Sequence, residues 1–167
     1  MRSLPGKTGK EKALRNFLCW VLIPFVFVLD RLFKIWVLLH LKEGEGFPLW
    51  VGVLHVTRVN NTGAAFGLWK NAAFFLTALG AVSVVCIVFY LYRLLKGAGA
   101  PDLVYGWALV AGGALGNLYD RVHFGYVIDF IDLRVWPVFN VADSAICLGV
   151  FWILLQFLRK KDGHERA

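Results

Sequence analysis

Charged residues are scarce in this chain of 167 residues. Only 17% of the residues are charged and 59% are hydrophobic, whereas an ordinary soluble domain has about 25% charged and roughly 45–50% apolar residues. This balance excludes a typical soluble globule and a disordered chain. The formal net charge is +7, but the basic residues lie in short blocks between long apolar runs. That pattern is typical of a polytopic membrane protein, and we expect no nucleic-acid partner.

The residue types that build most metal and nucleophile sites are also few or badly spaced. The three cysteines lie within apolar runs and form no CxxC pair, so neither a disulfide framework nor a zinc site is expected. The four histidines show no metal-ligand spacing, and no phosphate loop or dinucleotide fingerprint occurs. Serine is rare, although Ser144 with Lys34 as its base is a conceivable pair. We expect no metal and no cofactor, which leaves carboxylates as the best chemical candidates.

Four apolar stretches approach the length of about 20 residues that a membrane-spanning helix needs. They comprise residues 17–41, 72–95, 103–118 and 138–158. In the third, Gly112 and Gly116 form a small-xxx-small step, which lets two helix backbones approach closely. The first follows a basic block, as a signal peptide would, but it is too long and lacks a small-x-small cleavage site. We therefore expect it to be a retained helix.

The basic residues are distributed unevenly along this topology. Eleven of the 18 lysines and arginines fall in the two terminal tails and the loop after the second span, and five fall in the other two loops. The positive-inside rule therefore predicts that both termini are cytoplasmic. The expected organisation is a basic tail (1–16), a membrane domain (17–158) with outer loops at 42–71 and 119–139, and a second tail (159–167).

The two outer loops differ in composition from the tails. Residues 51–57 alternate as a strand does, and residues 126–135 are rich in β-branched and aromatic side chains. Gly44, Gly46, Pro48 and residues 60–63 are turn signals. The expected fold is an all-α membrane protein with four transmembrane helices and a small β-rich extracytoplasmic cap.

Polar residues from distant segments fall at one depth in this arrangement. At about 1.5 Å per residue, Asp30 lies roughly 20 Å across the bilayer, in its outer half. Ionisable groups at membrane depth are costly unless they pair or face a wet cavity, so they are candidates for function. The other members of this cluster are Lys34, Asn117, Asp120, Arg121, Asp129, Asn140 and Asp143.

Each member also has an ordinary structural explanation. Asp30 and Lys34 have the i,i+4 spacing of a helical ion pair. Asn140 followed by Asp143 is typical of a helix N-cap with an acid at the third helical position, and Asn61 could be only a turn residue. A helix end would account for Asn117, and an interfacial ion pair would account for Asp120 and Arg121. Asp129 is harder to explain, because the sequence offers it neither a cationic neighbour nor a helix end. The clustering is what favours a functional site.

Asp129 and Asp143 are the pair best suited to chemistry. They are fourteen residues apart, but the break at residues 136–137 lets the chain fold back. Two carboxyl groups that share a site cannot both ionise cheaply, so one keeps a proton while the other takes one from water, as in aspartic proteases. Asp143, at a helix N-terminus, is the better candidate for the charged partner, and Asp129 is then the acid, although a coupled pair titrates as a unit.

Five short motifs follow one another along residues 17–158. They are DRLFK from Asp30, NTGAAF from Asn61, GGALGNLYDR from Gly112, VIDF from Val127 and FNVADS from Phe139. In order and spacing they resemble the lipoprotein signal peptidase (signal peptidase II) family. The resemblance implies a bacterial inner-membrane aspartic endopeptidase that removes the signal peptide from prolipoproteins, cutting before a diacylglyceryl-modified cysteine. This chain departs from the commoner pattern at Arg31, where Gln is frequent.

The resemblance also implies roles for single residues. Asp129 and Asp143 would be the catalytic pair. Further residues would order the site, bind the substrate backbone or support those that do, namely Asn61, Asn117, Arg121, Asn140, Asp30, Lys34 and Asp120. The expected partners are the diacylglyceryl-modified prolipoprotein and membrane lipid, the expected state is a monomer, and the site would lie near the outer leaflet.

Two other functions fit the same residues. A small proton-coupled transporter also uses paired carboxylates, but it would need polar residues in both halves of the membrane, and residues 72–95 are nearly free of them. A structural protein would use the cluster only to hold its helices together. In that case, replacing Asp129 or Asp143 by Asn would unfold the protein rather than leave it folded and inactive.

Overall fold

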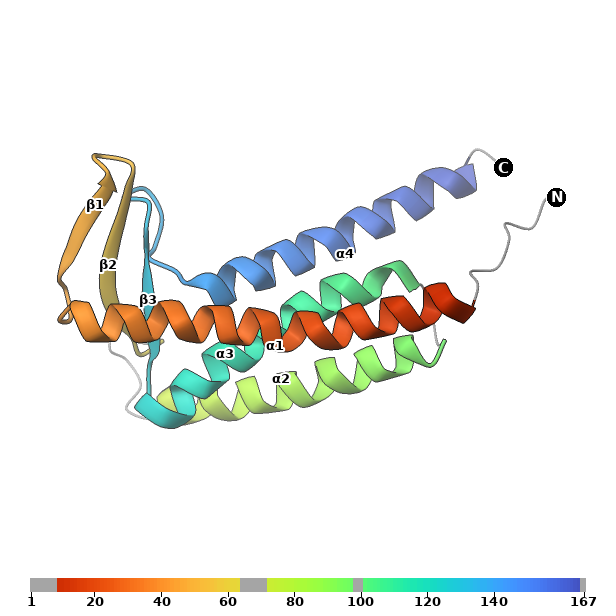
Figure 1. Ribbon diagram of the computed structural model, residues 1–167, viewed down its shortest axis with the longest axis horizontal. Coiled ribbons are helices and arrows are strands. Elements are labelled where there is room, and N and C mark those ends of the chain that lie inside the picture. The colour runs from red at the N-terminus through yellow and green to blue at the C-terminus, as the bar shows by residue number, and fades with distance from the viewer. Residues whose placement is uncertain (1–8, 64–71, 98–100, 166–167) are drawn as a thin grey trace.

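The computed structural model describes residues 9–63, 72–97 and 101–165 (Figure 1). In this part of the chain four long helices lie alongside one another, and a small sheet lies beyond the ends of the helices that are remote from the two termini (Figure 1). The helices are α1 (Gly9–His40), α2 (Ala72–Leu95), α3 (Val104–Phe124) and α4 (Val141–Glu165), with a short 3-10 turn, η2 (Pro101–Leu103), before α3. The strands are β1 (Gly46–Trp50), β2 (Leu54–Asn61) and β3 (Val127–Asp132).

Helix α3 packs against the other three helices, and its glycines allow the close approach. A Cβ atom on Gly112 would lie 2.8 Å from Val26 Cβ in α1, and one on Gly116 would lie 2.7 Å from an Asp30 carboxylate oxygen. A Cβ on Gly113 would collide with the backbone carbonyl of Ala142 in α4. The close approach expected at Gly112 and Gly116 is confirmed, and Gly113 extends it to α4.

Apolar side chains cover much of the outside of the helices, and several charged ones lie inside. Phe25, Phe89 and Phe151 are 58%, 60% and 64% exposed, whereas Asp30 and Lys34 are fully buried. Within the described residues, two segments are long and apolar enough to cross a membrane, Phe74–Leu95 in α2 and Val141–Arg159 in α4. Helices α1 and α3 carry charged residues on their buried faces, which lowers their apolar content. This distribution suits hydrocarbon surroundings better than water.

The sheet is antiparallel, with β2 between β1 and β3. The expected β-rich cap is therefore present, but two expected turn signals, Gly46 and Pro48, lie inside β1. Proline is tolerated there because β1 is an edge strand and needs no donor on its outer side. The turn itself follows at residues 51–53, where Gly52 has a φ of 75°.

Several helix ends differ from the ranges predicted from hydrophobicity. Helix α1 begins at Gly9 rather than at residue 17, and α4 extends to Glu165 rather than to residue 158. Helix α3 continues to Phe124, so residues 119–124, expected in an outer loop, are helical. The apolar run ends at residue 118, but the helix continues because Asp120 is paired inside the bundle and Gly125, with a φ of 79°, forms the C-cap.

Candidate active site

The first turn of α4 is closed by Asn140 and Asp143. The backbone N–H of Asp143 donates to Asn140 Oδ1 at 2.8 Å, and the backbone N–H of Asn140 donates to Asp143 Oδ2 at 3.3 Å. These reciprocal bonds satisfy two amides that have no intrahelical partner. The expected N-cap is confirmed, and it leaves Asp143 Oδ1 to accept the side-chain amide of Asn117 at 2.7 Å. The capping role and a role in the site therefore coexist.

Asp129 lies in β3 and is only 2% exposed. Its Oδ2 accepts an N–H of Asn61 at 2.8 Å, and its Oδ1 accepts an N–H of Asn140 at 2.7 Å. The register of the sheet brings Asn61 there, because Val59 of β2 pairs with Asp129. Asn61 also accepts the backbone N–H of Gly63 at 2.8 Å, so it forms a turn and contacts the acid as well.

Asn140 joins the two acids that the sequence separates by fourteen residues. Its amide nitrogen binds Asp129, and its amide oxygen and backbone N–H bind Asp143. The pKa of Asp129 is raised to about 6, mainly by burial and also by the Asp143 carboxylate, against the lowering effect of the hydrogen bonds from Asn61 and Asn140. The two carboxyl groups are therefore close enough for the charge of one to affect the proton of the other.

Lys34 is the cation at the centre of the polar cluster. Its Nζ lies 2.8 Å from Asp30, 2.7 Å from Asp120 and 3.0 Å from Asn117 Oδ1, which uses its three N–H donors. The hydroxyl of Ser144 donates instead to the Asn140 carbonyl at 2.9 Å. The alternative of a Ser144 nucleophile with Lys34 as base therefore has no support in the geometry.

The orientation of the Asn117 amide follows from its neighbours. Asn117 Oδ1 faces two donors, the Lys34 ammonium at 3.0 Å and an Asn140 N–H at 3.1 Å. A flipped amide would turn its own N–H groups toward both of them. Asn117 Nδ2 must therefore point at Asp143, and a single amide connects the buried cation to that carboxylate.

Two further carboxylates, of Asp30 and Asp120, are fully buried and have a second cation beside them. Arg31 Nη2 lies 3.1 Å from Asp30 Oδ2, and Arg31 Nη1 forms a 2.6 Å ion pair with Asp120 Oδ1 that lacks the alignment of a hydrogen bond. The guanidinium lies 4.7 Å from the ring centre of Tyr119. Arg31 was not among the residues expected in the site, although a cation next to Asp30 in the DRLFK motif was the available signal.

Arg121 is the expected site residue that the structure leaves outside this network. It lies in the last turn of α3 and is half-buried. Its carbonyl accepts the N–H of Gly125 at 3.1 Å, but its guanidinium makes no hydrogen bond or ion pair to any residue that the structure describes. The five donor N–H groups of the guanidinium remain open to a further partner.

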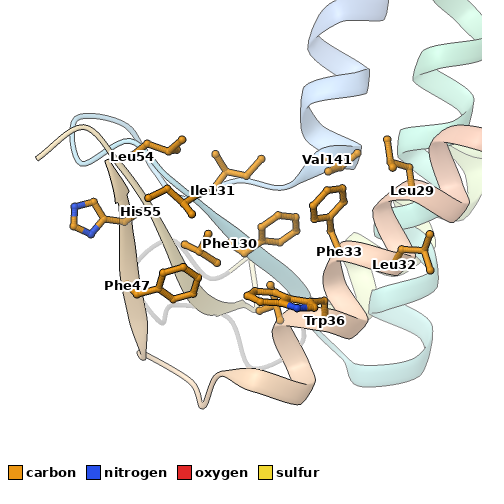
Figure 2. A pocket seen from close by; sticks show the side chains of 13 residues that line it. Leu29, Leu32, Phe33, Trp36, Phe47, Leu54, His55, Phe130, Ile131 and Val141 are labelled. Atoms are coloured by element: carbon orange, nitrogen blue, oxygen red, sulfur yellow. The ribbon is translucent and has the colours of Figure 1, made fainter. Parts of the chain in front are cut away.

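An apolar cavity of about 840 Å³ borders the site (Figure 2). Figure 2 shows Phe33 and Trp36 of α1 on one side and Phe47 and Phe130 of the sheet on the other. Phe130 directly follows Asp129, and Val141, which also lines the cavity, directly follows Asn140. The cavity wall and the acid pair are therefore built from the same two short segments.

Aspartic proteases work with two carboxyl groups that share one site, and the arrangement of Asp129 and Asp143 in this apolar helical protein resembles that class. A family model described as signal peptidase (SPase) II matches residues 22–159. The chain belongs to this signal peptidase II family, which is a family of aspartic proteases.

Individual relatives agree with this assignment. A lipoprotein signal peptidase of Syntrophomonas wolfei is 45% identical over 151 residues, which cover 89% of this chain and 98% of the relative. One from Halothermothrix orenii is 38% identical over 136 residues, covering 81% and 92%. A solved bacterial membrane enzyme superimposes with a TM-score of 0.76 at 29% identity, covering 87% of this chain and 90% of its own. The transporter alternative finds no support among these relatives.

Proposed function

We propose that this chain removes signal peptides from prolipoproteins by hydrolysing the bond before a diacylglyceryl-modified cysteine, with Asp129 and Asp143 as its catalytic pair. The observation that supports this pair most directly is the double contact of Asn140. One side chain binds Asp129 at 2.7 Å and accepts the Asp143 N–H at 2.8 Å. This contact joins two acids from different elements at the start of α4.

The proposed reaction needs one protonated and one ionised carboxyl group. Asp143, at the positive end of α4, takes a proton from a water molecule, whose oxygen attacks the scissile carbonyl carbon. Asp129, whose raised pKa suits an acid, gives its proton to the carbonyl oxygen. The intermediate then collapses and the C–N bond breaks. The leaving nitrogen takes the proton that Asp143 received from water, and Asp129 recovers its proton from a hydroxyl group of the intermediate. Arg121 and Asn61 are the proposed donors to the substrate backbone and the developing negative charge.

We place the protein in the bacterial inner membrane, with four spans and both termini in the cytoplasm. The exposed apolar surface of the helices and the burial of the α1 and α3 charges at the site support four spans. Among the described residues, segments of α2 and α4 are also long and apolar enough to cross a membrane. The sheet lies beyond the helix ends opposite both termini (Figure 1). With cytoplasmic termini, the acid pair at the sheet end then lies near the outer leaflet.

The diacylglyceryl group of the substrate is the proposed occupant of the apolar cavity. The cavity lies between α1 and the sheet, and its wall is continuous with the segments that carry both acids. Hydrocarbon placed there leaves water, which is favourable by about 25 cal/mol for each Å² buried. We expect the protein to act as a monomer because all the proposed site residues come from one chain.

The decisive experiment is cleavage of a lipidated prolipoprotein peptide by the purified protein. Wild-type protein should cut the lipidated peptide, whereas Asp129→Asn and Asp143→Asn should remain folded and inactive. Ser144→Ala serves as the control, because it removes a hydroxyl beside the site and should keep cleaving. Normal cleavage by either aspartate variant would refute the proposed pair, and unfolding of both would favour the structural role instead.

A further inference from the structure

Arg31 connects the carboxylates of two different helices. Its Nη2 lies 3.1 Å from Asp30 Oδ2 on α1, and its Nη1 lies 2.6 Å from Asp120 Oδ1 on α3. Both acids are fully buried, and the Arg31 side chain is only 11% exposed. The Tyr119 ring lies 4.7 Å from the guanidinium carbon, within the range of a cation–π contact. A planar guanidinium in contact with three groups has a well-defined orientation.

The other oxygen of each acid holds the backbone beside one of the two proposed catalytic residues. Asp30 Oδ1 accepts the N–H of Ala142 at 3.0 Å, and Ala142 directly precedes Asp143. Asp120 Oδ2 accepts the N–H of Ile128 at 3.1 Å, and Ile128 directly precedes Asp129. The two halves of the site therefore share one construction, in which a buried carboxylate holds the amide just before each member of the pair.

Lys34 alone cannot hold both carboxylates in this orientation. Its ammonium contacts Asp30 Oδ2 and Asp120 Oδ2, and its third donor goes to Asn117. Only Arg31 faces Asp120 Oδ1 among the residues that the structure describes. Without Arg31, two buried carboxylates would share one ammonium, and Asp120 could rotate away from the Ile128 amide to regain a partner for Oδ1.

We infer that Arg31 is a positioning residue for the acid pair, because it fixes the carboxylates that hold the Ala142 and Ile128 amides. The inference rests on the proposed function only in so far as Asp129 and Asp143 perform the catalysis. Arg31 acts through Asp30 and Asp120 and not on the substrate. Its loss should therefore lower kcat and leave KM nearly unchanged.

Three substitutions separate positioning from charge balance. Arg31→Met removes the charge and every donor that connects the two acids. Arg31→Lys keeps the charge, but a single ammonium lacks the planar fork that reaches Asp30 and Asp120 together. Tyr119→Leu keeps every charge and removes the ring beside the guanidinium, which also stacks on His123 and packs against Phe27. Arg93→Met, at an exposed position in the last turn of α2, is the matched control.

The test combines steady-state cleavage of a lipidated peptide with hydrogen exchange of the Ile128 and Ala142 amides, using the full chain in detergent. Misplacement of a catalytic group by about 1 Å can cost about 100-fold in rate. We expect Arg31→Met to lower kcat about 10- to 100-fold, Arg31→Lys to recover only part of this loss, and Tyr119→Leu to lose about two- to fivefold. Both amides should exchange at least about tenfold faster in Arg31→Met. Arg93→Met should match the wild type in every measurement.

Each outcome decides for or against positioning. Full kcat in Arg31→Met, or wild-type kcat in Arg31→Lys, would overturn the inference, the latter because charge alone would then suffice. If Arg31→Met does not fold, the Arg31→Lys and Tyr119→Leu variants decide by the same criteria. If the wild type fails to cut any lipidated peptide, the proposed function is refuted, and the exchange of the two amides still tests whether Arg31 holds them.

Discussion

Replacing Asp129 by Asn removes a buried acid whose ionisation opposes folding. Burial raises the pKa of Asp129 from 3.8 to about 6, and each pKa unit corresponds to about 1.4 kcal/mol. Below pH 3.8 the carboxyl group is protonated in both the folded and the unfolded state, so its ionisation does not change the free energy of unfolding. As the pH rises to 6, only the unfolded state releases its proton easily, so the free energy of unfolding falls by about 3 kcal/mol.

The Asp129→Asn variant cannot show this loss, because its side chain does not ionise. One amide hydrogen must now face Asn61 or Asn140, both of which donate to Asp129 in the wild type. Two donors that face each other in this way lower the free energy of unfolding by about 1–3 kcal/mol at every pH. The pH dependence is therefore the clearer measure. We expect the stability of Asp129→Asn relative to the wild type to improve by about 3 kcal/mol between about pH 3 and pH 7.

Thermal unfolding in detergent at several pH values measures this difference. For a chain of this length, 3 kcal/mol corresponds to a change of about 6–12 °C in Tm. Asp132→Asn is the control, because the backbone N–H of Arg134 holds the pKa of Asp132 below its ordinary value. Asp132 stabilises the fold at neutral pH and loses this effect on acidification, so its variant should show the opposite trend. A difference between Asp129→Asn and the wild type that does not vary with pH would refute the reasoning.

Three further substitutions test the packing around the site. Lys34→Met should lower the free energy of unfolding by about 3–5 kcal/mol, seen as a lower Tm, because it removes the central cation from two buried acids. Gly113→Ala should lower the free energy of unfolding by about 1–3 kcal/mol, and with it Tm and cleavage, because the new Cβ would meet the α4 backbone. Gly9→Ala is the control: its Cβ has no atom within 4 Å, so Tm and cleavage should not change. Leu29→Trp should narrow the apolar cavity, and kinetics should show a higher KM for lipidated peptide with a smaller change in kcat.

Local features of the sequence predict the elements that depend on nearby residues. The capping of α4 by Asn140 and Asp143 follows from two residues three positions apart. The close packing of α3 follows from the spacing of Gly112 and Gly116. The positions of the helices follow from apolar runs, although their ends do not, because a helix can continue past the apolar run when its next polar residue is paired inside the bundle.

Contacts between distant segments could not be predicted in this way. The register of β2 on β3 decides that Asn61 reaches Asp129, and a shift of one residue would turn Asn61 to the other face of the sheet. The interpretation of Asp30 and Lys34 as a simple pair is incomplete, because Asp120 and Asn117 share the same ammonium. Such partners depend on the packing of α1 against α3.

The amino-acid sequence by itself determined the apolar character of this protein, the order of its motifs and the candidate acid pair, because composition and short-range spacing carry that information. Only the tertiary structure decided that Asn140 contacts both acids and that Arg31 joins the carboxylates of Asp30 and Asp120. The physical reason is that a buried charge is stable only when the folded chain supplies its partners. Those partners come here from helices and strands far apart in the chain.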